Sequence, residues 1–220
     1  MKIQIVRDVL EANDQLAGDI RNVAKKEGFT LVNIMSSPGS GKTTFLERLI
    51  PELTKKGLRI AVIEGDITTT TDAERIAQMN IPVAQINTEP FGGDCHLGAE
   101  VILPALHKFD LSKLDLIFIE NVGNLVCPAE FDTGANFNFV VISTTEGEDK
   151  PLKYPLMFRV CDTAIINKID LVQYLDMDIS LLEKNIKQIN SDIRLVKCSA
   201  KTGENLEEAV NLIVSLVNSR

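Results

Sequence analysis

Several absences narrow the function of this chain before any motif is considered. The chain lacks an excess of positive charge: its 220 residues carry a net charge of −8, with a sequence pI of about 4.9. An acidic chain has no electrostatic reason to bind nucleic acid or an anionic membrane. It also lacks an apolar run long enough to span a bilayer. We therefore expect neither nucleic acid nor membrane among its partners.

Signals for export and for disulfide bonding are also missing. Charged residues interrupt positions 1–8, so we recognise no signal peptide. The cysteines are few and far apart, at positions 95, 127, 161 and 198. Without an export signal, such spacing is typical of thiols or metal ligands rather than of disulfide bridges. We expect a cytoplasmic protein.

No linker rich in proline, glycine or serine and no internal repeat divides the chain, so we expect one domain over residues 1–220. Apolar residues at helical spacing predict an N-terminal helix within residues 1–28, followed by a nucleotide-binding core over residues 29–220. In that core, apolar runs alternate with helix-like segments. The predicted strands are 30–35, 59–64, 83–87, 114–120, 139–143, 163–167 and 193–199. The predicted helices are 43–56, 72–79, 96–108, 179–188 and 205–217.

The predicted strands are continuously apolar, which is typical of a sheet covered by helices on both faces. Their alternation with helices predicts right-handed crossovers between parallel strands. The expected fold is α/β: a doubly wound, mostly parallel sheet of about seven strands flanked by helices, with a helix at the N-terminus. Ligands bind past the carboxyl ends of the strands in such folds, so functional residues are expected there.

The most informative segment covers residues 36–44 and reads Ser-Ser-Pro-Gly-Ser-Gly-Lys-Thr-Thr. A strand, a glycine-rich loop, Gly-Lys-Thr and a helix, in that order, form a phosphate-binding P-loop. We expect Lys42 to act as a catalytic residue on the β- and γ-phosphates, and the Thr43 hydroxyl to bind Mg²⁺. One departure is Ser36, since the strict pattern has glycine there. The nucleotide-binding residues expected in this segment are Gly39, Ser40, Gly41, Lys42, Thr43 and Thr44.

Two later segments indicate that the base is guanine. Residues 167–170 read Asn-Lys-Ile-Asp and fit the base-reading motif N-K-x-D. The Asp170 carboxylate can accept hydrogen bonds from N1–H and N2–H₂ of guanine, and adenine offers neither donor. Residues 199–201, Ser-Ala-Lys, resemble the loop whose backbone N–H approaches guanine O6. Each motif alone is a common turn composition, but their order after a P-loop predicts GTP and GDP as ligands, bound by Asn167, Lys168, Asp170, Ser199, Ala200 and Lys201.

Acidic residues at two strand ends are candidates for the magnesium site and the γ-phosphate switch. Thr43, Asp66 and Glu120 offer the hard oxygen ligands that Mg²⁺ prefers. Glu120 opens the sequence Glu-Asn-Val-Gly, which stands where a small GTPase has D-x-x-G, although no glutamine follows it. We expect Gly123 to place its N–H on the γ-phosphate and Asp72 to position the attacking water. Alternatively, Asp72 is a helix N-cap and Asp66 a turn former.

A Cys-His pair and one later cysteine are candidates for a second metal site. Cys95 and His96 stand at the start of a predicted helix, and Cys127 follows the Glu-Asn-Val-Gly segment closely. Thiolate and imidazole ligands suit Zn²⁺ or Ni²⁺, and a helix start lowers a thiol pKa. The spacing alone fits ordinary core cysteines equally well. We interpret Cys161 and Cys198 as small core residues.

In combination these motifs resemble the HypB family, GTPases that help to insert nickel into [NiFe]-hydrogenase. The resemblance rests on the P-loop, Glu-Gly-Asp at 64–66, Asp-Cys-His-Leu at 94–97, Glu-Asn-Val-Gly-Asn-Leu-Val-Cys-Pro at 120–128 and Asn-Lys-Ile-Asp at 167–170. The P-loop of that family also has serine at the position of Ser36. The resemblance implies a P-loop NTPase of the SIMIBI class, a GTP-dependent homodimer, and nickel or zinc bound by Cys95, His96 and Cys127. It also implies that hydrogenase maturation factors and the hydrogenase large subunit are partners.

Many members of that family carry an N-terminal nickel motif rich in cysteine or histidine. This chain has no cysteine or histidine before Cys95, so we do not expect a nickel store there. The main hypothesis is a GTP-hydrolysing nickel metallochaperone for [NiFe]-hydrogenase. The alternatives are a UreG-like GTPase that delivers nickel to another enzyme, a GTP-regulated binding module with structural zinc, and a P-loop kinase. The guanine motif and the lack of an arginine-rich lid disfavour the kinase.

Overall fold

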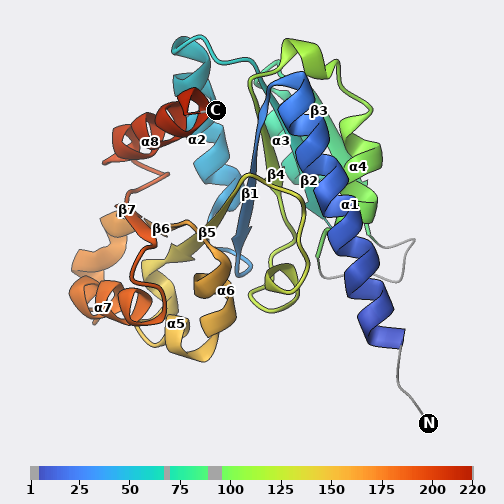
Figure 1. The fold of residues 1–220 in the computed structure, drawn as a ribbon. Helices are drawn as coiled ribbons and strands as arrows, with labels where there is room; N and C mark the ends of the chain where they lie inside the picture. Colours follow the sequence, from blue (N-terminus) through green and yellow to red (C-terminus); the bar gives the residue numbers. More distant parts are fainter. Residues whose placement is uncertain (1–4, 67–69, 89–95, 220) are drawn as a thin grey trace.

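A parallel sheet organises the described part of the chain. The computed structural model describes residues 5–66, 70–88 and 96–219. Seven strands lie in the order β3-β2-β4-β1-β5-β6-β7, and each neighbouring pair is parallel (Figure 1). The predicted strands are confirmed, with ends within two residues of their expected positions. The strands are β1 (Thr30–Ser36), β2 (Ile60–Asp66), β3 (Val83–Asn87), β4 (Leu116–Glu120), β5 (Phe137–Ser143), β6 (Thr163–Asn167) and β7 (Arg194–Lys197).

The helices confirm the predicted segments and add two short ones. They are α1 (Ile5–Glu27), α2 (Lys42–Lys55), α3 (Thr71–Ala77), α4 (Ala99–Leu106), α5 (Lys150–Lys153), α6 (Pro155–Val160), α7 (Ile179–Ile189) and α8 (Leu206–Asn218). The sequence did not reveal α5 and α6, because each is short and has a proline in its first turn. The helix expected from residue 96 instead begins at Ala99, so His96 lies before α4 rather than at its first turn.

Helices cover both faces of the sheet because successive side chains of a strand point to opposite sides. On one face, Val32 and Ile34 of β1 pack with buried residues of α2 and α8. On the other face, Leu31 packs with α1 and α4, and Met35 packs with α6 and α7. Figure 1 shows α2 and α8 on the side of the sheet opposite to α1 and α4. The doubly wound arrangement expected from the sequence is thus confirmed.

Helix α1 is fastened to the segment between β4 and β5. Asn13 donates a hydrogen bond from Nδ2 to the Asp132 carbonyl oxygen at 2.9 Å, and Arg21 pairs with the Asp132 carboxylate at 2.6 Å. Gly134 packs so closely that a Cβ there would lie 2.7 Å from the Ala17 carbonyl oxygen. Although α1 has 23 residues, neither it nor any other helix of the described ranges is long and apolar enough to cross a membrane.

Candidate functional site

The sheet brings two predicted site residues, Glu120 and Asn167, and their neighbours to the carboxyl ends of its strands. Register pairs Glu64 of β2 with Glu120 of β4, and Glu120 with Ile34 of β1, next to the P-loop. On the other side of β1, Ser143 of β5 pairs with Asn167 of β6. All five residues lie at or near the carboxyl ends of parallel strands, where this architecture binds ligands.

The P-loop turns on glycines with left-handed backbone geometry. Gly39 has φ 76° and Gly41 has φ 96°, and a Cβ on Gly41 would lie 2.7 Å from Nδ2 of Asn167. Helix α2 begins at Lys42, so its first N–H groups lack helical partners and can bind an anion. Lys42 donates from Nζ to Oγ of Ser36 at 3.1 Å. Ser36, the departure from the strict motif, therefore contacts the P-loop lysine.

Asn167 joins the predicted base-reading segment to the P-loop and to the Ser-Ala-Lys segment. Its Nδ2 donates to the Ser40 carbonyl oxygen at 2.9 Å, and its Oδ1 accepts from the Ala200 N–H at 3.0 Å. Lys168 has φ 63° and donates from Nζ to the Gly39 carbonyl oxygen at 2.7 Å. The structure thus brings together three segments that lie far apart in the sequence.

The remaining residues predicted to contact the base lie beside this junction. Oδ1 of Asp170 is buried and has no hydrogen-bond partner in the described part of the chain. Ser199 is fully buried, and its Oγ accepts from the Thr202 N–H at 3.1 Å. Lys201 is exposed, and its carbonyl oxygen accepts from Arg48 at 3.1 Å. Oδ1 of Asp170 can therefore accept a hydrogen bond from a ligand at this junction.

Two buried carboxyl groups lie beside the start of α2. The Thr43 hydroxyl donates to Oε1 of Glu120 at 2.7 Å. Oε2 of Glu120 and Oε2 of Glu64 are both buried, and neither has a hydrogen-bond partner within the described ranges. Unpartnered buried carboxylate oxygens next to a hydroxyl form a donor set that fits a hard cation such as Mg²⁺.

The pKa values of Glu64 and Glu120 are both raised, because the two carboxyls are buried without enough positive charge beside them. Burial, together with the negative charges of Glu120 and Asp66, raises the pKa of Glu64 to about 8. Burial also raises the pKa of Glu120 to about 7, although Lys42 and the hydrogen bond from Thr43 lower it. Glu64 was not among the site residues predicted from the sequence. Its position in the Glu-Gly-Asp segment, at a strand end, was the signal that could have found it.

Asp72 lies in the first turn of α3, which begins at Thr71, so the alternative prediction that it caps this helix is wrong. Its carboxylate pairs with Arg75 at 2.8 Å. Arg75 also pairs with Glu47 at 2.6 Å and donates to Oγ1 of Thr44 at 3.2 Å. Asp72 therefore has an ion-pair partner on its own helix, and this partner connects it to α2 and to the P-loop.

The Glu-Asn-Val-Gly segment reaches the P-loop through its glycine. A Cβ on Gly123 would lie 3.1 Å from Cα of Pro38, so the backbones of the two segments are nearly in contact. Asp66 is the last residue of β2 and is half-buried. The structure thus places Gly123 against the P-loop. Asp66 lies at the carboxyl end of β2, at the same end of the strands as the P-loop.

Only part of the predicted Cys/His metal set lies among the described residues. His96 stacks on the ring of Phe131 with 3.9 Å between ring centroids. Cys127 begins a 3₁₀ turn, η3 (Cys127–Ala129), and its Sγ accepts from Nδ2 of Asn124 at 3.5 Å. Cys95 lies outside the described residues, and within them no three His, Cys, Asp or Glu side chains are close enough to share a metal ion. The predicted set of Cys95, His96 and Cys127 therefore stays a prediction.

The other two cysteines are core residues, as predicted. Cys161 is 2% exposed and Cys198 is fully buried. Burial raises the pKa of Cys198 to about 12 and raises that of Cys161 as well. Neutral, buried thiols of this kind act as small apolar side chains.

Glu146 is a site residue that the sequence did not reveal. It ends a 3₁₀ turn, η4 (Thr144–Glu146), directly after β5. Its Oε1 accepts from Oγ of Ser40 at 2.7 Å, and its Oε2 accepts from Oγ of Ser37. Lys150 lies 3.7 Å from the same carboxylate. No motif marks this residue; its position directly after a strand was the only signal.

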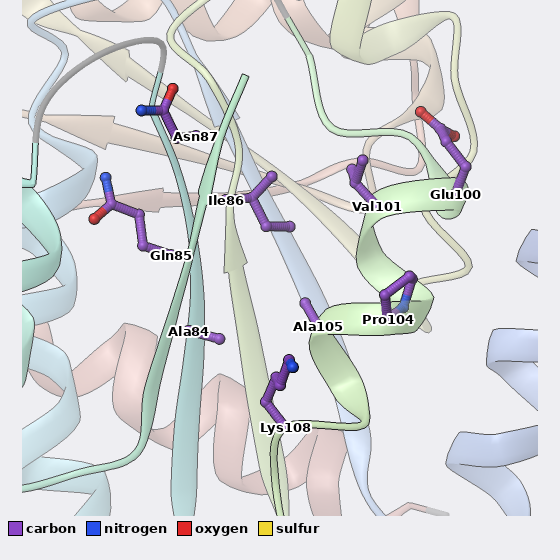
Figure 2. Close-up of a pocket in the computed structure, with 9 residues that line it drawn as sticks. All are labelled: Ala84, Gln85, Ile86, Asn87, Glu100, Val101, Pro104, Ala105 and Lys108. Carbon is purple, nitrogen blue, oxygen red and sulfur yellow. The ribbon is translucent and has the colours of Figure 1, made fainter. Parts of the chain in front are cut away.

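A cavity of about 540 Å³ lies elsewhere, between β3 and α4 at the sheet edge (Figure 2). Ile86, Val101 and Ala105 give it an apolar lining, and Glu100 and Lys108 lie on its α4 side. None of its nine lining residues belongs to the P-loop or the base-reading segment. This cavity is therefore separate from the candidate nucleotide site.

Comparisons with known proteins agree with this geometry. Residues 30–197 match the family model for the CobW/HypB/UreG nucleotide-binding domain. Over 94% of its length the chain is 44% identical to hydrogenase maturation factor HypB of Azotobacter vinelandii, and it covers 67% of that protein. The chain belongs to the HypB family. It is also 42% identical to a probable HypB of Methanocaldococcus jannaschii, with 96% of this chain and 94% of that protein covered.

A solved HypB structure extends the agreement to three dimensions. The crystal structure of HypB from Helicobacter pylori in complex with nickel has a TM-score of 0.88 to this chain at 37% identity, and it covers 94% of this chain and 96% of that one. The family resemblance read from the motifs is thus confirmed, as is the SIMIBI-class P-loop fold.

Proposed function

We propose that this chain is a GTP-hydrolysing nickel metallochaperone that assists nickel insertion into [NiFe]-hydrogenase. The observation that carries the choice of nucleotide is the half-buried Asp170 side chain, whose buried Oδ1 has no hydrogen-bond partner in the described part of the chain. Two donors of guanine would satisfy it, whereas adenine would leave it unsatisfied at a cost of a few kcal/mol. The name of the family supports a role in hydrogenase maturation.

The nucleotide is expected to lie across the junction of three segments. In this proposal the N–H groups from Gly39 to Thr44 hold the phosphates, with Lys42 on the β- and γ-phosphates. Asn167 and Lys168 fix the base-reading segment against the P-loop, as their hydrogen bonds to Ser40 and Gly39 support. Ser199, Ala200 and Lys201 complete the base pocket.

Hydrolysis in this proposal depends on the buried carboxyl pair. Thr43, Asp66 and Glu120 hold Mg²⁺ directly or through water, and we add Glu64 as a ligand through water because of its unpartnered oxygen. Bound Mg²⁺ neutralises charge that develops on the phosphates. Gly123 donates its N–H to the γ-phosphate, and Asp72 positions water once it exchanges its Arg75 partner. Since no glutamine orients the water, we expect slow turnover.

Nickel is the cargo in this proposal, held by Cys95, His96 and Cys127, and zinc is the competing metal. Three protein ligands leave one coordination position open, which suits transfer better than storage. The nickel complex of Helicobacter pylori HypB supports the choice of metal. The proposed location is the cytoplasm, as expected from the sequence.

The proposed assembly is a GTP-dependent homodimer of a single-domain chain, residues 1–220. Its proposed partners are hydrogenase maturation factors and the hydrogenase large subunit. The HypB relatives support hydrogenase maturation, and UreG-like delivery to another enzyme is the alternative. The other alternative, a GTP-regulated module with structural zinc, differs from the proposed function because it would hold its metal and not release it.

Competition between nucleotides tests the proposal. With Mg²⁺ present, we expect GTP to bind roughly a hundredfold more tightly than ATP, since only guanine satisfies the Asp170 carboxylate. Ni²⁺ should bind the same protein and pass to a chelator of intermediate affinity. Equal affinities for GTP and ATP would refute the base assignment, and metal that never leaves would favour the structural-zinc alternative.

A further inference from the structure

The side chain of Asn121 connects the Glu-Asn-Val-Gly segment to the segment that contains His96. Asn121 follows Glu120 directly and is fully buried. Its Oδ1 accepts hydrogen bonds from the Leu97 N–H at 3.0 Å and from the Val122 N–H at 2.9 Å. One amide oxygen thus holds the residue after His96 and a residue of the predicted γ-phosphate switch.

A chain of side-chain amides, two buried and one half-buried, fixes the orientation of Asn121. Its Nδ2 donates to Oδ1 of Asn33 on β1 at 3.2 Å. The Asn33 Nδ2 in turn donates to Oδ1 of Asn138 on β5 at 3.1 Å. Because each amide uses its nitrogen as donor and its oxygen as acceptor, Asn121 cannot flip without breaking the chain. The Asn121 side-chain oxygen is therefore held in position to accept from the Leu97 N–H.

The Leu97 side chain provides a second contact between the same two regions. Leu97 is fully buried, and a Cβ on Gly65 would lie 2.5 Å from its Cδ1. Gly65 stands between Glu64 and Asp66, at the end of β2. The residue after His96 therefore packs on the strand end that carries two of the proposed magnesium residues.

Asn13 of helix α1 joins the residues that follow His96 to the segment that contains Phe131, whose ring stacks on His96. The Ala99 N–H donates to Oδ1 of Asn13 at 3.0 Å, and Nδ2 of Asn13 donates to the Asp132 carbonyl oxygen at 2.9 Å. Asp132 follows Phe131, whose ring stacks on His96. The segments that follow His96 and Cys127 are therefore both joined to α1, and Asn121 joins the first of them to the switch.

We propose that Asn121 is a positioning residue that transmits the nucleotide state to the metal site, an inference that rests on the proposed function. Asn121 lies between Glu120 and Gly123, the residues proposed to face Mg²⁺ and the γ-phosphate. A shift of this segment moves the Asn121 oxygen, and Leu97 follows because its buried N–H would otherwise lose its acceptor. His96, the neighbour of Leu97, then moves as well, so metal affinity depends on the bound nucleotide.

The test measures Ni²⁺ affinity in the GDP state and in the state bound to a non-hydrolysable GTP analogue. For the wild type we expect the two affinities to differ by roughly 5- to 150-fold, the usual range of such coupling. Asn121→Ala should still bind Ni²⁺ and both nucleotides. The ratio of its Ni²⁺ affinities in the two nucleotide states should fall to within about threefold of unity. Asn185→Ala is the matched control, since it also removes a buried amide, one that donates to the Glu148 carbonyl oxygen at 2.8 Å. It should keep the wild-type ratio.

Two further variants keep the inference testable if Asn121→Ala does not fold. Asn121→Ser retains a shorter acceptor and should keep part of the ratio. Gly65→Ala leaves Asn121 intact but displaces Leu97, so it should also lower the ratio. A wild-type ratio in the variants that fold would overturn the inference and leave the proposed function standing. A wild type that binds no guanine nucleotide or no Ni²⁺ would refute the proposed function itself, and the inference with it.

Discussion

Glu64 of β2 and Glu120 of β4 are register partners on neighbouring parallel strands, and each is only 2% exposed. A carboxylate without solvent or a cation is costly to ionise, which explains why both pKa values are raised. Lys42 and Thr43 only partly stabilise the ionised form of Glu120. We therefore expect ionisation of this pair to be unfavourable by itself and to become favourable when a divalent cation binds.

A consequence at the residue scale is pH-dependent stability of the nucleotide-free protein. The pKa of Glu64 rises from an ordinary value of 4.5 to about 8 on folding. Its contribution to stability is then complete below the unfolded pKa and is lost as the pH rises through about 8. We expect the wild-type Tm to fall between about pH 5 and pH 8, and Glu64→Gln, which cannot ionise, to lose less Tm over that range. Thermal unfolding without Mg²⁺ measures this, and parallel curves for the two proteins would contradict it.

Base selection is the other property that depends on a single residue. Asp170→Asn replaces an acceptor with a group that can donate to the 2-oxo group of xanthine. We expect GDP affinity to fall by roughly 10- to 100-fold and XDP affinity to rise. Titration with both nucleotides measures the change. Asp176→Asn, an exposed carboxylate outside the proposed pocket, should leave both affinities unchanged; equal effects of the two substitutions would exclude direct base recognition.

At the scale of elements, the P-loop depends on a turn that follows another strand. Glu146 ends η4, next to β5, and its carboxylate accepts hydrogen bonds from the hydroxyls of Ser37 and Ser40. These contacts fix the P-loop before a nucleotide arrives. The negative charge should repel phosphate, but Lys150 lies 3.7 Å away and offsets part of that repulsion. We therefore expect the positioning effect to exceed the repulsion.

Substitutions at this turn separate the two effects. Glu146→Ala removes the acceptor for both serines and should weaken GDP binding by about 1–3 kcal/mol. Glu146→Gln keeps an acceptor oxygen and removes the charge, so it should bind GDP more tightly than the alanine variant. Calorimetric titration of both variants measures this. Tighter binding by Glu146→Ala than by the wild type would show that repulsion is the larger effect.

At the scale of the whole molecule, metal binding and assembly are expected to respond to the nucleotide together. Gly123 lies against Pro38 of the P-loop, and Cys127 begins η3 only four residues later. A nucleotide that moves this segment therefore moves a proposed metal ligand and reshapes the surface near it. Reciprocity requires Ni²⁺ to change GTP affinity by the same factor by which GTP changes Ni²⁺ affinity.

The corresponding prediction concerns mass in solution. We expect a monomer with GDP and a dimer with a non-hydrolysable GTP analogue and Mg²⁺, measured by light scattering. Lys42→Ala should remain monomeric with the analogue, because it loses the cation that binds the β- and γ-phosphates. A single mass in both nucleotide states would refute nucleotide-dependent dimerisation while leaving nucleotide binding intact.

The sequence by itself determined the order of strands and helices, the P-loop and the base-reading segment. These features were accessible because their residues are contiguous: Lys42 and Thr43 follow the loop glycines, and Asp170 lies three residues after Asn167. Continuous apolar strands also determined the parallel, helix-covered sheet, as the burial of every residue of β1 confirms. The short helices α5 and α6 were missed because four to six residues carry too little periodicity.

Tertiary structure alone decided which distant residues share a site. Glu64 and Glu120 became one carboxyl pair through strand register, and Glu146 reached Ser37 across more than a hundred residues. Likewise, only the packed structure placed the Asn121 oxygen on the Leu97 N–H. The physical reason is that a local pattern specifies the conformation of its own segment. Which side chains meet, and hence which charges are buried without a partner, depends on the register and packing of the whole sheet.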